Sequence, residues 1–313
     1  MRVVVRAASA ALRSANCLIE GRECARAPPL AVVLGGGTVG VEMADAFASF
    51  GSRVTVIEAG PRVLAREEPF AGDEVCAAFA EAGIDVRAGT SATAVSRANG
   101  RVTVELDDGS SVSGDEILVA VGRRILSADL GVEELGVEPG RPIEVDDTLR
   151  VPGHDWLYVI GDANGRALLT HMGKYQGRIT ADRILGRDVA LRSDGGLSPR
   201  VTFTDPQVAA VGHTLASAQE AGIDARAVDV PTGGNAGGSF VGLGAPGTAR
   251  IVVDEDRRVI VGATFTGPEV AEALHAATIA VIGEVSLDDL WHAVPCFPTR
   301  SELWLKLLEA YGL

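Results

Sequence analysis

The sequence lacks long apolar runs. No stretch approaches the ~18 uninterrupted apolar residues that a membrane-spanning helix needs, so we expect no membrane partner. Apolar residues still make up 47% of the 313-residue chain, which is enough for buried cores. A chain of this length predicts about two domains, at ~150 residues each.

Positive charge is scarce as well. The formal net charge is −14 at pH 7 and the isoelectric point is about 4.8. A nucleic-acid binder needs a basic surface that neutralises phosphates, and this composition offers none. We therefore expect no nucleic-acid partner.

Cysteine is rare and irregularly spaced. Cys17, Cys24, Cys76 and Cys296 show no metal-ligand spacing, so we expect no metal site and a reducing, cytoplasmic location. The acid-free start MRVVVRAASAALRSANCL superficially resembles a targeting peptide. Arginines interrupt its apolar runs, and residues 3–5 are better explained as a strand.

A glycine turn follows the first clear strand, AVVL at residues 31–34. The turn has the pattern G-x-G-x-x-G, with Gly35, Gly37 and Gly40 as its glycines. Apolar spacing then predicts a helix from Thr38 to Phe50. Such a turn lets backbone approach a pyrophosphate, which the helix N–H groups and dipole bind. The alternative is a turn that merely packs helix on strand.

A second match to the glycine pattern is discarded. GLGAPG, residues 242–247, contains Pro246 and precedes a strand-like segment, so it offers a phosphate no helix N-terminus.

Glu58 ends the next predicted strand, residues 54–58, and lies 18 residues beyond Gly40. Its carboxylate can accept hydrogen bonds from both adenosine ribose hydroxyls and would repel a 2′-phosphate. This favours NADH over NADPH, although Arg62 lies close enough in sequence to weaken that preference. The alternative is a solvated acid at a strand end.

The pattern of apolar residues predicts the remaining helices and strands and divides the chain into three parts. The first part continues with a predicted helix at 73–83, a strand at 84–86, a hairpin of 102–106 with Val112, and a strand at 117–122. The second part, residues 123–192, ends in a strand at 157–162 and a helix from His171 to Leu185. After Pro199, strands at 200–204, 249–254 and 259–267 and helices at 268–282 and 301–310 predict an α+β domain. The glycine-rich residues 231–244 are expected to form a surface loop.

These motifs, in this order, resemble the class I pyridine nucleotide-disulfide oxidoreductases, flavoenzymes similar to dihydrolipoamide dehydrogenase and mercuric reductase. GGGTVGVE and LVAVGRR resemble the NAD domain of that family. LYVIGDANG resembles the end of its flavin domain, and LLTHMGKYQGR resembles the segment that passes the flavin ring. FTDPQVAAVGHT and FPTRSE resemble its interface domain.

The resemblance implies an α/β fold. We expect a Rossmann-type NAD-binding domain at 30–122, a remnant of the FAD-binding domain at 1–29 and 123–192, and a C-terminal α+β dimerisation domain at 193–313. It also implies a homodimer, for which the last helix offers an apolar face of Leu303, Trp304, Leu307 and Leu308.

The resemblance also implies cofactor contacts. Residues expected to bind NAD(H) are Gly35, Gly37, Gly40, Glu42, Glu58 and Gly122. Asp162 occupies the position of the aspartate on the FAD ribityl chain, and His171 that of a family histidine.

Parts of the flavoenzyme are not found in the sequence. About 29 residues precede the NAD domain, without the glycine turn that holds FAD, and Arg6, Ala7 and Ala8 stand where relatives have an A-T-G turn. We therefore expect FAD to be absent or weakly bound. The C-x-x-x-x-C motif of the redox disulfide is missing too, since six residues separate Cys17 from Cys24.

The C-terminal motif of the family, H-x-H-P-T-x-S-E, is also altered. Phe297 replaces the acid/base histidine and Pro295 the earlier one, while Glu302 is retained. A phenyl ring cannot carry a proton, so that step is lost unless the nearby His292 substitutes. Some flavin-bearing relatives have an F-P-T form as well, so this change alone does not exclude the family's activity.

Three functions are compatible with these features. The first is a repurposed enzyme that catalyses a non-disulfide step, such as a cyclisation, an isomerisation or another tailoring of a small biosynthetic molecule. Its site would be the space vacated by flavin, lined by Asp162, His171, Lys174 and Tyr175 and by the partner's His292, Phe297 and Glu302. His171, Glu302, His292 and Phe297 are the candidate catalytic residues. The alternatives are an NADH-dependent reductase that uses substrate or exchangeable flavin as acceptor, and a non-catalytic NAD-binding scaffold.

Overall fold

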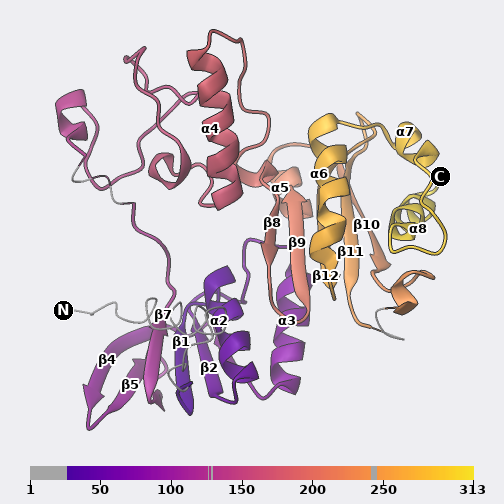
Figure 1. Ribbon diagram of the computed structural model, residues 1–313. Helices are drawn as coiled ribbons and strands as arrows, with labels where there is room; N and C mark the ends of the chain where they lie inside the picture. The colour runs from indigo at the N-terminus through magenta and orange to yellow at the C-terminus, as the bar shows by residue number, and fades with distance from the viewer. Residues whose placement is uncertain (1–26, 126, 128–129, 241–244) are drawn as a thin grey trace, which may run out of the picture.

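The computed structural model describes residues 27–125, 127, 130–240 and 245–313. Three parts follow one another along the chain: an N-terminal unit (27–122), a middle lobe (123–192) and a C-terminal unit (193–313) (Figure 1). In Figure 1 the N-terminal unit lies below the middle lobe, and the C-terminal unit lies beside both. The predicted strand at 3–5, Cys17 and Cys24 lie outside the described residues.

The N-terminal unit is built on a parallel sheet. Its main elements are β1 (Leu30–Leu34), α2 (Thr38–Ser49), β2 (Arg53–Glu58), α3 (Pro69–Glu81), β3 (Asp85–Ala88) and β7 (Glu116–Val119). The strand order is β3–β2–β1–β7, with β1 in parallel register with both β2 and β7. Val41 of α2 and Phe79 of α3 are buried in one cluster with Val33 and Val56 of the sheet. The carboxyl ends of the strands therefore share one edge, which is where ligands bind in sheets of this kind.

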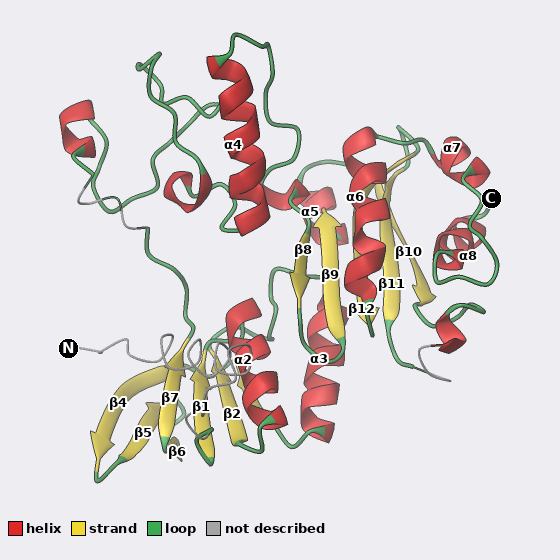
Figure 2. Cartoon of the chain, viewed as in Figure 1, coloured by secondary structure: helices red, strands yellow, loops and turns green. Residues whose placement is uncertain are grey.

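An antiparallel meander covers the other face of this sheet (Figure 2). It consists of β4 (Ala92–Ala98), β5 (Arg101–Leu106) and β6 (Ser111–Gly114). Val104 and Leu106 are buried with Val32 and Ile57 of the sheet. The predicted hairpin around D-D-G is confirmed, whereas β4, which is largely exposed, was not predicted.

The middle lobe contains little regular structure beyond α4 (Thr170–Ile184). The prediction of a strand at 157–162 is wrong. Tyr158 makes one isolated antiparallel bridge with Arg150, and Gly161–Asn164 form a 3₁₀ turn. A strand needs a neighbour to accept its hydrogen bonds. Among the described residues no strand lies beside this segment.

The C-terminal unit is an antiparallel sheet with helices. Its elements are β8 (Arg200–Thr202), β9 (Gln207–Gly212), α5 (Leu215–Glu220), β10 (Ala225–Pro231), β11 (Thr248–Asp254), β12 (Val259–Gly267), α6 (Leu274–Gly283), α7 (Leu287–His292) and α8 (Glu302–Tyr311). The strand order is β10–β11–β12–β9–β8. Every residue of β12 is buried, which makes it the centre of this α+β unit. The predicted helix at 268–282 begins as a 3₁₀ turn, Val270–Ala273, before α6.

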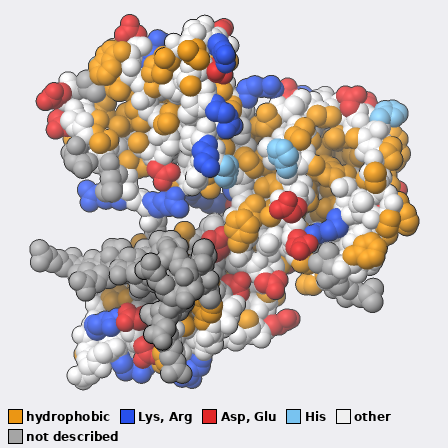
Figure 3. All heavy atoms as spheres, viewed as in Figure 1, with side chains coloured by type: hydrophobic (Ala, Val, Ile, Leu, Met, Phe, Trp, Pro, Cys, Tyr) orange, Lys and Arg blue, Asp and Glu red, His pale blue; other side chains and the backbone are white. Residues whose placement is uncertain are grey.

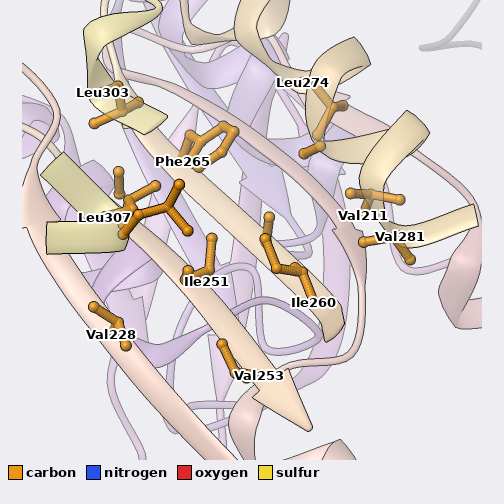
Figure 4. Close-up of a cluster of buried hydrophobic side chains, with 14 of the residues drawn as sticks. Val211, Val228, Ile251, Val253, Ile260, Phe265, Leu274, Val281, Leu303 and Leu307 are labelled. Atoms are coloured by element: carbon orange, nitrogen blue, oxygen red, sulfur yellow. The ribbon is translucent and has the colours of Figure 1, made fainter. Parts of the chain in front are cut away.

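The apolar face of α8 is not free for a partner chain, contrary to expectation. Leu303, Leu307 and Leu308 are buried in the core of their own unit, where Figure 4 shows Leu303 and Leu307 near Phe265. Trp304 is partly buried and packs edge-to-face on Phe265, with ring centroids 6.1 Å apart. Periodicity identified an apolar face but not the surface that covers it.

Ion pairs join the N-terminal and C-terminal units. The Arg200 guanidinium donates to both carboxylate oxygens of Glu67, at 2.7 and 2.8 Å. Arg250 donates to Glu68 at 2.8 Å, and the Glu68 side chain is only 2% exposed. Val208 of β9 is buried within the apolar cluster of the N-terminal unit. The two units therefore share a packed, charged joint.

In the part of the chain that the structure describes, no helix is both long enough and apolar enough to cross a membrane.

Candidate functional site

The glycine turn is tightly packed at two of its three glycines. Gly35 has a φ of +108°, and a Cβ there would stand 2.5 Å from the Ala120 carbonyl oxygen. A Cβ on Gly40 would stand 1.8 Å from the Gly35 carbonyl oxygen. The fold itself therefore requires glycine at both positions, because any side chain would collide with backbone.

Gly37 is different. Its φ of −73° suits any residue, and a Cβ there would meet no atom of the described residues within 4 Å. Gly37 is also the N-cap of α2, and no side chain of the described part of the chain caps the first N–H groups of this helix. Open space next to uncapped helical N–H groups fits a bound anion such as a pyrophosphate.

Glu58 lies beside this turn at the end of β2. Its Oε2 accepts a hydrogen bond from Gly36 N–H at 2.5 Å, and its Oε1 accepts one from Gly60 N–H at 2.6 Å. Leu64 N–H in turn donates to the Gly36 carbonyl at 2.9 Å. Each carboxylate oxygen has a further lone pair, so Glu58 is held in place and can still accept from ribose hydroxyls.

The bonds of Gly36 and Gly60 to Glu58 were not foreseen. The sequence E-A-G at 58–60 was the available signal, because a short turn brings a backbone N–H back to the acid. Arg62 extends toward α3, and its Cδ lies 3.6 Å from where a Cβ would stand on Gly72.

Gly122 and Glu42 extend the turn region on two sides. Gly122 has a φ of +133°, and none of the described residues comes within 4 Å of its Cβ position. Glu42, one turn along α2, accepts a hydrogen bond from Phe203 N–H of the C-terminal unit at 2.8 Å. Burial raises the pKa of the Glu42 carboxyl, and the hydrogen bond from Phe203 opposes this shift. Cofactor binding by either residue stays a prediction.

Asp162 and His171 lie on two elements of the middle lobe that pack on each other, the 3₁₀ turn at Gly161–Asn164 and α4. A Cβ on Gly173 of α4 would stand 3.3 Å from the Cα of Gly161, so the Asp162 turn packs on the start of α4. Asp162 is exposed, and its Oδ2 lies 3.5 Å from an Arg123 nitrogen. His171 Nε2 lies 2.8 Å from the Pro199 carbonyl oxygen. Because a carbonyl only accepts, Nε2 carries a proton there and Nδ1 stays available.

Lys174 and Tyr175 are the other two residues of the middle lobe that are expected to line the flavin space. Lys174 is exposed, and the Tyr175 hydroxyl accepts from Arg192 N–H at 3.0 Å.

The C-terminal candidates lie in a different part of the chain. His292 is exposed at the end of α7, and the Phe297 side chain is 78% exposed. Glu302 starts α8, and its Oε2 is buried with no hydrogen-bond partner among the described residues. These three residues are expected to reach His171 from a partner subunit. The structure contains a single chain, so this arrangement stays a prediction.

Two cysteines are described, and both are free. Cys76 is half-buried on α3, and burial followed by the charge of Asp73 raises its pKa, which disfavours the reactive thiolate. Cys296 is exposed and precedes Phe297.

One hollow in the described part lies in the C-terminal unit and is lined by Gly237, Phe240, Glu269, Thr299 and Arg300. Asp162 and His171 do not line it. No group of His, Cys, Asp and Glu side chains among the described residues has metal-binding geometry.

Comparisons with known proteins cover nearly the whole chain. Residues 9–177 match the family model for pyridine nucleotide-disulphide oxidoreductases, and residues 198–307 match the model for the dimerisation domain of that family. Dihydrolipoyl dehydrogenase from Chlamydia pneumoniae is 33% identical over 284 residues, which are 89% of this chain and 60% of the relative. The enzyme of that name from Rhizobium etli is 30% identical over 91% of this chain and 60% of its own length.

Solved structures agree. LpdA from Mycobacterium tuberculosis superposes with a TM-score of 0.83 at 26% identity, covering 92% of this chain and 62% of LpdA. The flavoprotein disulfide reductase RclA from Escherichia coli, as its Cu(II) complex, gives a TM-score of 0.80 at 26% identity, covering 90% and 64%. The chain thus spans about three fifths of the length of the curated relatives it matches. A Rossmann-like parallel sheet, a C-terminal dimerisation domain and these matches together show that the chain belongs to the pyridine nucleotide-disulphide oxidoreductase family.

Proposed function

We propose that this chain is a pyridine-nucleotide-dependent oxidoreductase that binds NAD(H) at the glycine turn of α2. The observation that carries the proposal is the open space at Gly37, with Glu58 fixed beside it. The first N–H groups of α2 would bind the pyrophosphate, and Glu58 would accept from the adenosine ribose. A bound NAD(H) supplies or accepts a hydride.

Gly37→Val tests the proposal directly. The side chain would fill space that the described residues leave empty, so we expect the fold to persist while NADH binding falls at least tenfold. Gly196→Val is the matched control, because Gly196 also has open space and no positive φ but lies far along the chain. Calorimetric titration with NADH measures the affinity. Unchanged NADH binding by Gly37→Val would contradict the proposal.

The flavin requires a separate measurement. Asp162 is exposed, so its carboxylate is available to a ribityl hydroxyl as the resemblance implies. The absorption spectrum of the purified protein, compared between the wild type and Asp162→Ala, reports flavin content. Flavin in the wild type that is retained in equal amount by Asp162→Ala would remove Asp162 from the proposed cofactor contacts.

A second candidate function is a non-disulfide step on a small molecule. Phe297 favours it, because an exposed phenyl ring stands where relatives have the acid/base histidine. Under this proposal His171, Glu302 and Phe297 would contribute to the site, and activity would not depend on the cysteines. Rapid NADH-dependent reduction of a disulfide substrate that is lost when the cysteines are replaced by serine would rule it out.

A further inference from the structure

The segment between β8 and β9 of the C-terminal unit lies against one side of α2 (Figure 1). In Figure 3, acidic side chains gather along the border between these two units. Three contacts join the segment to the helix: Thr202 Oγ1 to Thr38 Oγ1 at 3.4 Å, Phe203 N–H to Glu42 Oε1 at 2.8 Å, and Asp205 N–H to Asp45 Oδ2 at 3.0 Å. Spacings of four and three residues place the α2 partners on one side of the helix. The helix that carries the proposed nucleotide site is therefore attached directly to the C-terminal unit.

α2 packs on the parallel sheet through a different side. Its buried residues are Gly40, Val41 and Ala44, and the last two belong to the apolar cluster of the sheet. At ~3.6 residues per turn, the centre of this buried side lies roughly a third of a turn from the side that carries Asp45. One line of contact leaves a helix free to roll about its axis, whereas two lines on different sides fix the roll. The contacts with residues 202–205 therefore act on the direction in which the first N–H groups of α2 point.

Asp45 separates positioning from direct binding, because it lies far from the proposed pyrophosphate. It follows the N-cap Gly37 by eight residues in the helix, a rise of ~12 Å along the axis. Burial raises the pKa of the Asp45 carboxyl, the hydrogen bond from Asp205 N–H opposes this shift, and the charge of Asp205 adds to it. The charge of Asp45 is therefore unfavourable at this position, and an uncharged acceptor can keep the bond without it.

We infer that Asp45 is a positioning residue: by accepting from Asp205 N–H of the C-terminal unit, it fixes the roll of α2 and aims the first N–H groups of the helix at the pyrophosphate. The inference rests on the proposed NAD(H) site. It makes nucleotide affinity depend on the C-terminal unit, although Gly37, α2 and Glu58 all belong to the N-terminal unit.

The test compares Asp45→Ala with Asp45→Asn and Glu74→Ala. Glu74 of α3 is the matched control, because it is also a partly buried acid that joins the N-terminal unit to the C-terminal sheet. Its Oε1 accepts from Thr248 Oγ1 at 2.6 Å, and its Oε2 accepts from the Thr266 hydroxyl. Asp45→Ala removes a charge that burial and Asp205 both disfavour, so we expect this variant to fold.

Calorimetric titration should show that Asp45→Ala weakens NADH binding about tenfold, less than the ~10²-fold that a 1 Å misplacement can cost. Asp45→Asn keeps an acceptor for Asp205 N–H and should restore the wild-type affinity, and Glu74→Ala should retain it. Without nucleotide, hydrogen–deuterium exchange across residues 38–49 should be faster in Asp45→Ala than in the wild type, because α2 has lost one of its two lines of contact. Glu74→Ala should leave that exchange unchanged.

Three affinity results would overturn the inference. Wild-type affinity in Asp45→Ala would mean that the aim of α2 does not depend on this contact. An equal loss in Glu74→Ala would mean that any loosening between the two units weakens binding. Failure of Asp45→Asn to restore affinity would assign the effect to the charge and not to the bond.

The exchange measurement separates this inference from the proposed function. Unchanged exchange across 38–49 in Asp45→Ala would refute the role of Asp45 whether or not the protein binds NADH. Faster exchange in Asp45→Ala, with a wild type that fails to bind NADH, would support the positioning of α2 while the proposed function falls.

Discussion

At the scale of single residues, Glu58 offers the sharpest test of nucleotide choice. Replacing it with glutamine removes the charge that would repel a 2′-phosphate while retaining one oxygen for Gly36 or Gly60 N–H. We expect the preference for NADH over NADPH to fall about tenfold, which corresponds to ~1.4 kcal/mol. Calorimetric titration with both nucleotides measures it.

The control for Glu58 is an exposed acid elsewhere in the same unit. Glu81→Gln, at the end of α3, removes the same charge away from the glycine turn and should leave the ratio unchanged. If wild-type protein bound NADPH more tightly than NADH, the role given to Glu58 would be wrong.

Spacing predicted the glycine turn and Glu58, because both depend on residues close together in sequence. The contacts of Arg123 could not be predicted in the same way. Its partners lie 39 and 45 residues further along the chain, and only the folded chain determines which turn an exposed arginine reaches.

At the scale of elements, the Glu42 carboxyl group joins α2 to the C-terminal unit. Burial destabilises the charged form of this carboxyl group. Burial raises the pKa of Glu42 above its ordinary value of 4.5. A raised folded-state pKa gives stability that is present below the unfolded value and is lost as pH rises through the folded value.

Glu42→Gln should therefore stabilise the protein at neutral pH. Glutamine can still accept from Phe203 N–H but has no charge to desolvate. We expect its advantage over the wild type to shrink as pH falls below the raised pKa and to vanish below 4.5. Urea unfolding from pH 4 to pH 8 measures this, and a constant difference at every pH would contradict it.

The ion pair between Glu68, the N-cap of α3, and Arg250 of β11 predicts the opposite effect, a loss of stability on substitution. Arg250 neutralises the buried Glu68 carboxylate, pairs with Asp229 and lies over the Phe70 ring at 5.0 Å. Arg250→Met leaves that carboxylate buried without its cation and should cost about 3–5 kcal/mol of unfolding free energy. Glu309→Gln, which breaks the exposed pair with Lys306, should change it by less than ~1 kcal/mol. Equal losses in chemical denaturation would show that the Arg250 pair contributes no more than a surface contact.

Elements were predictable where local signals sufficed. The apolar spacing between Thr38 and Phe50 and the glycine after it define α2, and D-D-G defines the β5–β6 turn. The segment at 157–162 has strand-like residues, but extended backbone becomes a strand only beside a partner. The predicted helix at 268–282 began late because residues 270–273 form a 3₁₀ turn before α6.

At the scale of the whole molecule, the C-terminal unit leaves apolar side chains exposed on its helices. Ile279 of α6 and Trp291 of α7 are exposed, and so is Val294 beyond them. With the dimerisation-domain match at 198–307, we propose that this surface forms a homodimer.

Ile279→Glu should then shift the protein toward monomer, because it places a charge in an apolar contact. Ile184→Glu, at the end of α4 where the side chain is 67% exposed against 57% for Ile279, should leave the mass unchanged. Light scattering at micromolar concentration measures both. A monomeric wild type would refute the proposal.

The position of Val208 has a consequence for how the molecule melts. This residue belongs to β9, yet it completes the apolar cluster of a unit that ends at residue 122. Because the C-terminal unit fills part of the interior of the N-terminal unit, the N-terminal unit cannot keep its full packing once the C-terminal unit separates from it. The N-terminal and C-terminal units, which the whole middle lobe separates in sequence, are therefore expected to unfold in one cooperative transition. The calorimetric and van't Hoff enthalpies of that transition should agree.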